Sequence, residues 1–175
     1  EIIKSSTPKA IKDDLKESLK LILNKDEDGL KNFVKKIKSK FKKMSVEEIA
    51  FPRGVSDISK FQKGTKNDSP LNSYIKGTPI HSKGCIFYNW LVKNKNSKRD
   101  YIKEKSKIKF VYLKEMNPWK MNSIAFPDDF PSELIEKKYI DYDTQFEKTF
   151  LSIIKSITDV IGWNLSLFKN LNSFF

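Results

Sequence analysis

The sequence predicts an α+β fold, a mainly helical domain with one small antiparallel β hairpin. Apolar residues recur at steps of three and four over residues 11–22, 30–41 and 146–161, which indicates amphipathic helices. Two short segments rich in β-branched and aromatic residues, 107–113 and 122–126, can pair as the hairpin. We therefore expect one domain over residues 1–162, followed by a C-terminal tail over residues 163–175.

Two amphipathic helices are expected first. One begins at Thr7-Pro8, with Thr7 as the N-cap and Pro8 in the first helical position. A polar turn over residues 24–29 leads to the second, which buries Leu30 to Phe41 at helical spacing. Its other face carries a stripe of four lysines, Lys31, Lys35, Lys38 and Lys42. That stripe either follows a phosphate backbone or is the solvated side of the helix.

The central part alternates short elements with loops. Residues 46–51 favour a strand closed by Pro52 and a turn at 53–54, and Ser56 is expected to cap a short helix. Residues 62–79 predict a long surface loop. A packed helix follows over residues 84–92, and a basic loop over 94–106 leads to the hairpin.

The C-terminal part is expected to be helical again. Ser132 is predicted to cap a short helix that continues to Lys138. The last helix runs from about Asp143 to Ile161, and Gly162 ends it.

Composition excludes several classes of protein. With 13 Phe the chain has too many aromatics for a disordered protein, and no run of 18 apolar residues is present for a membrane span. Cys85 is the single cysteine, which excludes an intrachain disulfide and favours a reducing compartment. His81 is the single histidine, so a zinc site of several Cys and His ligands cannot form.

Charge is distributed in blocks, and the net charge is +12. Residues 31–43 hold seven Lys and no acid, and residues 93–109 hold seven Lys plus Arg99 against two acids. Residues 128–147 hold seven acids against two Lys. Blocks of one sign indicate a partner of the other sign, and phosphate backbone is the commonest polyanion. Solvated faces of a lysine-rich protein are the alternative.

Two pairs of residues have the side-chain types of a catalytic site, but each pair lacks the further residues that such a site needs. Asp141 and Asp143 form a D-x-D pair that can hold Mg²⁺, although Asp143 is equally an ordinary N-cap. His81 and Cys85 stand one helical turn apart but lack a third orienting group, so Cys85 is better read as a core residue. A hydrolase built on either pair is the weaker hypothesis.

Residues 76–84 form the most unusual local sequence, Lys-Gly-Thr-Pro-Ile-His-Ser-Lys-Gly. Two glycines permit close backbone approach, two lysines flank a histidine, and a helix is expected to follow directly. Helix N-termini favour anions, so this segment predicts a phosphate-contacting loop, with a plain turn as the alternative.

The order of segments resembles the thumb region of the T-even-phage type of family-B DNA polymerase. Residues 79–84, Pro-Ile-His-Ser-Lys-Gly, resemble that family's Pro-Phe-His-Ile-Arg-Gly. Residues 111–118 followed by 124–127 are similar to its Val-Leu-Pro-Leu-Arg-Glu-Gly-Asn-Pro and Ile-Ala-Trp-Pro. Residues 140–141 and 146–150 look like its Trp-Ile-Asp and Phe-Gln-Lys-Ser-Phe, and residues 5–10 look like the segment that leads into the thumb.

The resemblance implies a segment that holds primer–template duplex by its phosphates and carries no catalytic residue. The palm, with its Mg²⁺ site, and the fingers and exonuclease domains of the family would precede it. The implied DNA-contact residues are Ser5, Thr7, Lys9, Lys76, His81, Lys83, Lys114 and Lys120. Lys83 stands where the family has Arg, which keeps the charge but loses bidentate geometry.

The C-terminal tail stands where the family binds its sliding clamp. Leu171, Phe174 and Phe175 are the implied apolar anchors, with back-packing onto the domain as the alternative. The chain begins Glu1-Ile2-Ile3 without Met, which we interpret as a fragment of a phage replicative polymerase acting in the cytoplasm of an infected bacterium. A free-standing basic DNA-binding replication accessory protein, or a split polymerase, remains the alternative.

Overall fold

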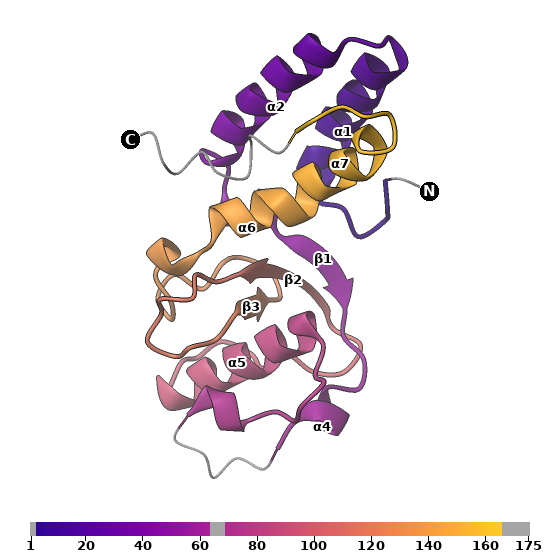
Figure 1. Ribbon diagram of the computed structural model, residues 1–175. Coiled ribbons are helices and arrows are strands. Elements are labelled where there is room, and N and C mark those ends of the chain that lie inside the picture. Colours follow the sequence, from indigo (N-terminus) through magenta and orange to yellow (C-terminus); the bar gives the residue numbers. More distant parts are fainter. Residues whose placement is uncertain (1–2, 64–68, 166–175) are drawn as a thin grey trace. The chain divides into compact units, whose positions relative to one another are not determined.

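The computed structural model describes residues 3–63 and 69–165. The chain folds into two compact units (Figure 1). Unit 1 combines the residues up to Ile49 with those from Tyr142 onward, and unit 2 is the intervening segment Ala50–Asp141. Helices dominate and one antiparallel sheet accompanies them. The α+β, mainly helical class is thus confirmed.

Unit 1 is helical. Its first part contains α1 (Lys9–Leu23), α2 (Glu27–Phe41) and the short α3 (Val46–Ile49). Its second part is a helical run of α6 (Tyr142–Phe146), a π-helical stretch labelled η3 (Glu147–Leu151) and α7 (Ser152–Thr158). The two amphipathic helices expected at the N-terminus are therefore present.

The apolar stripes of these helices meet in one core. Ile11 and Leu15 of α1 and Leu30 and Val34 of α2 are completely buried. Each side chain of this size stabilises the fold by about 1.5–3 kcal/mol when buried. Three rings, Phe41, Phe146 and Phe150, extend the core, with successive ring centroids 5.4 Å apart.

The turn between α1 and α2 is held by local hydrogen bonds. Asp26 is the N-cap of α2, and its carboxylate accepts a hydrogen bond from the Gly29 amide at 2.8 Å. A Cβ at Gly29 would come within 2.0 Å of that carboxylate, so the Asp26 side chain would have to shift to admit any other residue here. Across the pair, Lys40 Nζ lies 2.9 Å from Asp14.

Unit 2 is built around a three-stranded antiparallel sheet in the order β1-β2-β3. Its strands are β1 (Phe51–Gly54), β2 (Lys107–Tyr112) and β3 (Ser123–Phe126). The hairpin predicted over 107–126 corresponds to β2 and β3, in which Phe110 pairs with Ala125 and Tyr112 with Ser123. Short helical turns surround the sheet: α4 (Ile58–Phe61), η1 (Pro70–Asn72) and η2 (Lys137–Tyr139).

One long helix, α5 (Ile80–Asn94), packs directly on this sheet. Gly84 makes the close approach possible, because a Cβ there would lie 2.8 Å from the Ala125 amide nitrogen. Phe87 and Leu91 are completely buried. The predicted helix over 84–92 is confirmed, but it begins four residues earlier, so His81 and Lys83 are helical rather than in the preceding loop.

The strand predicted over residues 46–51 is wrong. Ser45 and Glu48 form a capping box, in which each side chain accepts a hydrogen bond from the other's amide, and this starts α3. The strand begins only at Phe51 and runs through Pro52. Proline is accepted because β1 is an edge strand, where one side needs no ladder hydrogen bond.

Three smaller predictions also differ from the structure. Pro8, in an extended conformation, is the N-cap of α1, and Thr7 is buried without capping the helix. Asp57, not Ser56, precedes α4. Residues 132–136 form turns, and only the 3₁₀ turn η2 replaces the helix predicted from Ser132.

The last helix ends earlier than predicted, at Thr158, and a turn that includes Gly162 follows it. The Trp163 amide donates to Thr158 O at 2.9 Å and the Gly162 amide to Asp159 O at 3.4 Å. This Schellman pattern places Gly162 at a φ of 78°, which glycine adopts without strain. Within residues 3–63 and 69–165, no helix is long and apolar enough to cross a bilayer.

Candidate nucleic-acid interface

The turn that carries Lys76 is held by two hydrogen bonds. The Thr78 amide and hydroxyl both donate to Ile75 O, at 3.4 and 2.6 Å. Gly77 occupies the third position of this turn with a φ of 85°, where a side chain would be strained. Lys76 is exposed at the second position. Its charge is thus presented by a defined turn.

His81 lies in the first turn of α5. The Lys83 amide donates to Pro79 O at 2.9 Å, so the amides before Lys83 have no intrahelical partner and carry the positive end of the helix dipole. The His81 ring is half-buried, 6.2 Å from the Phe110 ring. Burial, and secondly the nearby Arg53 charge, lower the pKa of His81. It is therefore a neutral hydrogen-bonding group at pH 7, not a cation.

Lys83 is held by an aromatic ring. Its ammonium lies 5.3 Å from the ring centroid of Tyr74, within the range of a cation–π interaction. Burial of the same ring raises the pKa of Tyr74. The lysine stem is half-buried, so the charge has a restricted position close to the Lys76 turn.

Lys114 and Lys120 lie on the loop that closes the hairpin, residues 114–121. The Asn117 amide, itself buried, holds this loop from inside. Its nitrogen donates to Lys114 O at 2.6 Å and Met121 O at 2.8 Å. Its oxygen accepts from the Trp119 and Met121 amides, each at 3.2 Å. We call residues 114–121 the Asn117 loop.

The start of α5 and the Asn117 loop lie at the same end of the hairpin. Ser123 Oγ, in the first residue of β3, donates to Ile80 O at 2.8 Å. Ser123 pairs with Tyr112, the last residue of β2, and the loop extends from these two strand ends. Four of the predicted lysines thus lie on two segments that adjoin this end of the hairpin, the start of α5 with the turn before it and the Asn117 loop. We call them the lysine group: Lys76, Lys83, Lys114 and Lys120.

Nothing in the described structure neutralises this group. Over residues 3–63 and 69–165, none of the four lysines takes part in an ion pair. Unpaired ammonium groups attract a polyanion.

Arg53 is a basic residue that sequence reasoning missed. It is exposed on β1, and its charge adds to the lowering of the pKa of His81 by burial and opposes the rise that burial gives to the pKa of Tyr112, so it lies near both residues. The sequence pattern predicts a turn at residues 53–54, whereas the structure has a strand there. The signal in the sequence is an arginine two residues after Phe51, because a strand places both side chains on the same face.

The basic segment 93–109 has a different environment. Arg99 pairs with both Asp129, at 2.8 Å, and Glu133, and its hydrogen bonds lower the pKa of both carboxyl groups. Lys95 Nζ donates to Leu134 O at 2.8 Å. Part of the positive block therefore faces the acidic block of the same unit, and the opposite charge expected from a partner is here intramolecular.

The remaining predicted contacts lie elsewhere. Ser5 and Lys9 are exposed in unit 1, whereas Thr7 is buried. Leu171, Phe174 and Phe175 lie outside the described residues. These assignments stay predictions.

The two candidate catalytic pairs gain no support. Cys85 is completely buried and its desolvation raises the pKa of the thiol to about 12, so it is a neutral core residue as expected. Asp143 lies 3.6 Å from Lys38. In the part of the chain that the structure describes, no three His, Cys, Asp or Glu side chains converge as metal ligands would.

Comparison with known proteins finds similarity to two phage enzymes. The DNA-directed DNA polymerase of Enterobacteria phage T4 is 26% identical over 166 residues, 93% of this chain. The DNA-directed DNA polymerase of Escherichia phage RB69 is 28% identical over 162 residues, 90% of this chain. The chain resembles a segment of phage DNA polymerases. No family model matches it.

The similarity covers nearly all of this chain but little of the relatives. The chain spans 18% of the length of the T4 enzyme and 17% of the RB69 enzyme. It confirms the resemblance deduced from the motif order.

Proposed function

We propose that this chain is the C-terminal thumb segment of a phage family-B DNA-directed DNA polymerase. In this role it holds the newly made primer–template duplex by its phosphates, and does not itself transfer nucleotides. The similarity over nine-tenths of the chain to two enzymes named DNA-directed DNA polymerases carries the proposal. The lysine group supports it.

The chemistry of the lysine group fits a duplex backbone. Lysine is a point charge that meets phosphate oxygens without reading base edges, as an enzyme that moves along any sequence requires. The Asn117 loop and the Gly77 turn fix the backbone beneath three of these lysines, so less ordering is needed on binding. Neutral His81 would supply a hydrogen bond rather than a charge.

The rest of the proposed function follows from the polymerase role. Catalysis with Mg²⁺ belongs to the palm domain of a whole enzyme, together with its fingers and exonuclease domains. The tail residues Leu171, Phe174 and Phe175 would bind the sliding clamp. The enzyme would act in the cytoplasm of the infected host.

Salt-dependent duplex binding tests the proposal. The 175-residue chain should bind duplexes of unrelated sequence with similar affinity and incorporate no nucleotide. Replacing all four lysines of the lysine group by alanine should reduce the steepness of log affinity against log salt by roughly three to four. A variant with unchanged steepness and affinity would show that the duplex is held elsewhere or not at all.

A further inference from the structure

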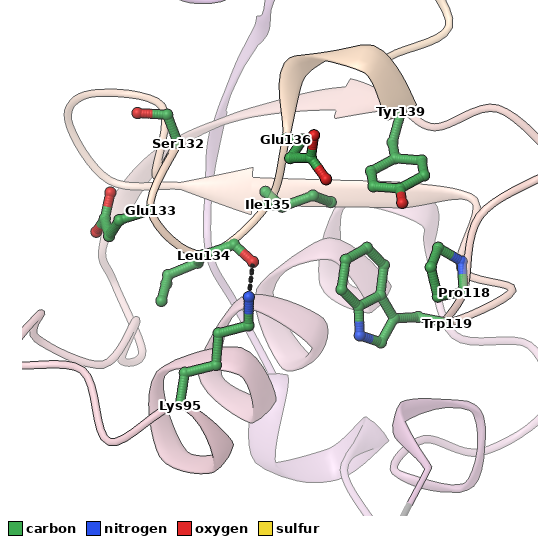
Figure 2. Close-up of a pocket in the computed structure, with 9 residues that line it drawn as sticks. All are labelled: Lys95, Pro118, Trp119, Ser132, Glu133, Leu134, Ile135, Glu136 and Tyr139. Atoms are coloured by element: carbon green, nitrogen blue, oxygen red, sulfur yellow. Dashed lines mark hydrogen bonds between the residues drawn. The ribbon is translucent and has the colours of Figure 1, made fainter.

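A small cavity opens beside the Asn117 loop in unit 2. It has a volume of about 240 Å³ and lies between Trp119 of the loop, Lys95 after α5, Tyr139 of η2 and the turn over residues 132–136 (Figure 2). Neither the proposed duplex contact nor the sequence motifs account for it. Its size suits one flat ring or one side chain rather than a larger ligand.

The cavity walls are aromatic and held in place. The Trp119 ring packs against Phe87 and against Tyr139, each with ring centroids 5.5 Å apart. Trp119 and Tyr139 are half-buried, so each has an accessible surface. Leu134 and Ile135, both buried, add apolar lining. A planar apolar group can enter without a large rearrangement.

The acidic residues at the cavity are already paired. The Glu136 carboxylate forms an ion pair with Lys138 Nζ at 2.7 Å, and the Glu133 carboxylate pairs with Arg99. This leaves little uncompensated negative charge for a cationic guest. Lys95 donates to Leu134 O and has two further ammonium hydrogens for a polar edge.

The backbones of two lysines adjoin residues that line the cavity. Lys120 follows Trp119 in the chain, and the Lys114 amide donates to Tyr139 O at 2.8 Å. Both lysine side chains are exposed. An aromatic surface bordered by unpaired lysines is the arrangement with which proteins bind single strands, the base stacking on the ring and the phosphates meeting the cations.

We propose that this cavity accepts one unstacked nucleobase of a single-stranded nucleic acid, stacked on Trp119, with Lys114 and Lys120 against the flanking phosphates. Bases inside a duplex are stacked and paired, so they cannot enter. The site is therefore distinct from the duplex contact, although it shares two lysines with it, and it does not depend on that function.

Binding of matched oligonucleotides to the 175-residue chain tests the site. The probes are oligothymidylate, oligouridylate, an abasic strand of the same length and a duplex of that length. Oligothymidylate should bind at least about fivefold more tightly than the abasic strand, as one base stack provides. The two oligomers distinguish DNA from RNA as the source of the base.

Substitution of Trp119 locates the contact. Trp119→Leu should remove the preference for bases over abasic strand and leave duplex affinity within about twofold. Trp119→Phe should retain most of the preference for strands with bases, because an aromatic ring remains. Trp163→Leu, the same change at a half-buried tryptophan of unit 1, is the matched control and should have no effect.

A second measurement covers the case in which Trp119→Leu fails to fold. In a Trp90→Phe, Trp163→Phe chain, Trp119 is the remaining tryptophan and its fluorescence should be quenched by oligothymidylate but not by the abasic strand. Equal quenching by both strands, or quenching by a proline-rich peptide and by no oligonucleotide, would overturn the proposal. Failure of the duplex alone to bind would overturn only the proposed function.

Discussion

Two basic regions of unit 2 differ in what their charges face. In the segment around Arg99, the guanidinium of Arg99 contacts two carboxylates, those of Asp129 and Glu133. The lysine group has no ion pair in the described structure. A count of lysines along the sequence treats both regions alike. The comparison teaches that Arg99 contributes to stability, whereas the charges of the lysine group are free for an external polyanion.

Charge reversal should separate the two regions most strongly. Lys114→Glu with Lys120→Glu should weaken duplex binding by about a hundredfold at 0.1 M salt, because two phosphate contacts become repulsive. Lys93→Glu with Lys98→Glu changes the net charge by the same amount in the Arg99 region. This variant should weaken duplex binding less than about fivefold. Fluorescence anisotropy measures both. Equal losses would mean that only net charge matters.

The Asn117 loop should prove sensitive because one buried amide serves four hydrogen bonds. Asn117→Ala should lower the free energy of unfolding by about 2 kcal/mol, since buried partners are left unsatisfied. Duplex affinity should fall about fivefold as Lys114 and Lys120 lose their fixed positions. Urea unfolding and anisotropy give the two values. Asn122→Ala, an exposed neighbour, should change neither, and a similar loss there would contradict the assignment.

Arg99 should affect stability and not DNA. Arg99→Met should reduce the free energy of unfolding by about 1 kcal/mol at pH 7, a small value because both carboxylates are largely solvated. Arg99 lowers the pKa of Asp129 and Glu133, so its contribution is complete above their unfolded values near 4 and disappears as the pH falls through the lower folded values. Urea unfolding should therefore show the two proteins converging towards pH 2. If the two free energies of unfolding differed by the same amount at every pH, the ion pairs would not be the cause of the difference.

The smallest effect is expected from His81. Because its pKa is lowered, duplex affinity should stay constant from pH 8 to 7 and rise only in more acidic solution, by about threefold, as one exposed ion pair forms. His81→Ala should abolish the rise. Arg53→Ala should shift it to higher pH, and nuclear magnetic resonance of the single imidazole reports the pKa directly. A rise centred above pH 7 in the unaltered chain would show that His81 is not desolvated.

Local patterns in the sequence predicted the elements whose apolar residues follow one period. The stripes of α1 and α2 and the pairing of β2 with β3 are of this kind. The prediction failed where a hydrogen bond decided the structure: the Ser45–Glu48 capping box turned an expected strand into a helix. Of the site, the lysines were predictable from the family resemblance. Arg53 and the Arg99 pairs were not, because they depend on contacts between distant segments.

The edge of β2 also determines where unit 2 begins and ends. Phe51 pairs with Phe110, and Ile140 bridges Leu113 on the same side, with the Asp141 amide donating to Tyr112 O at 3.0 Å. Phe51 and Asp141 therefore occupy positions two residues apart along β2, roughly 7 Å. The 89 residues between Phe51 and Asp141 thus begin and end at almost the same point of unit 2. Such an insertion can be exchanged for another, or for a few linking residues, without stretching the helices that precede and follow it in the chain.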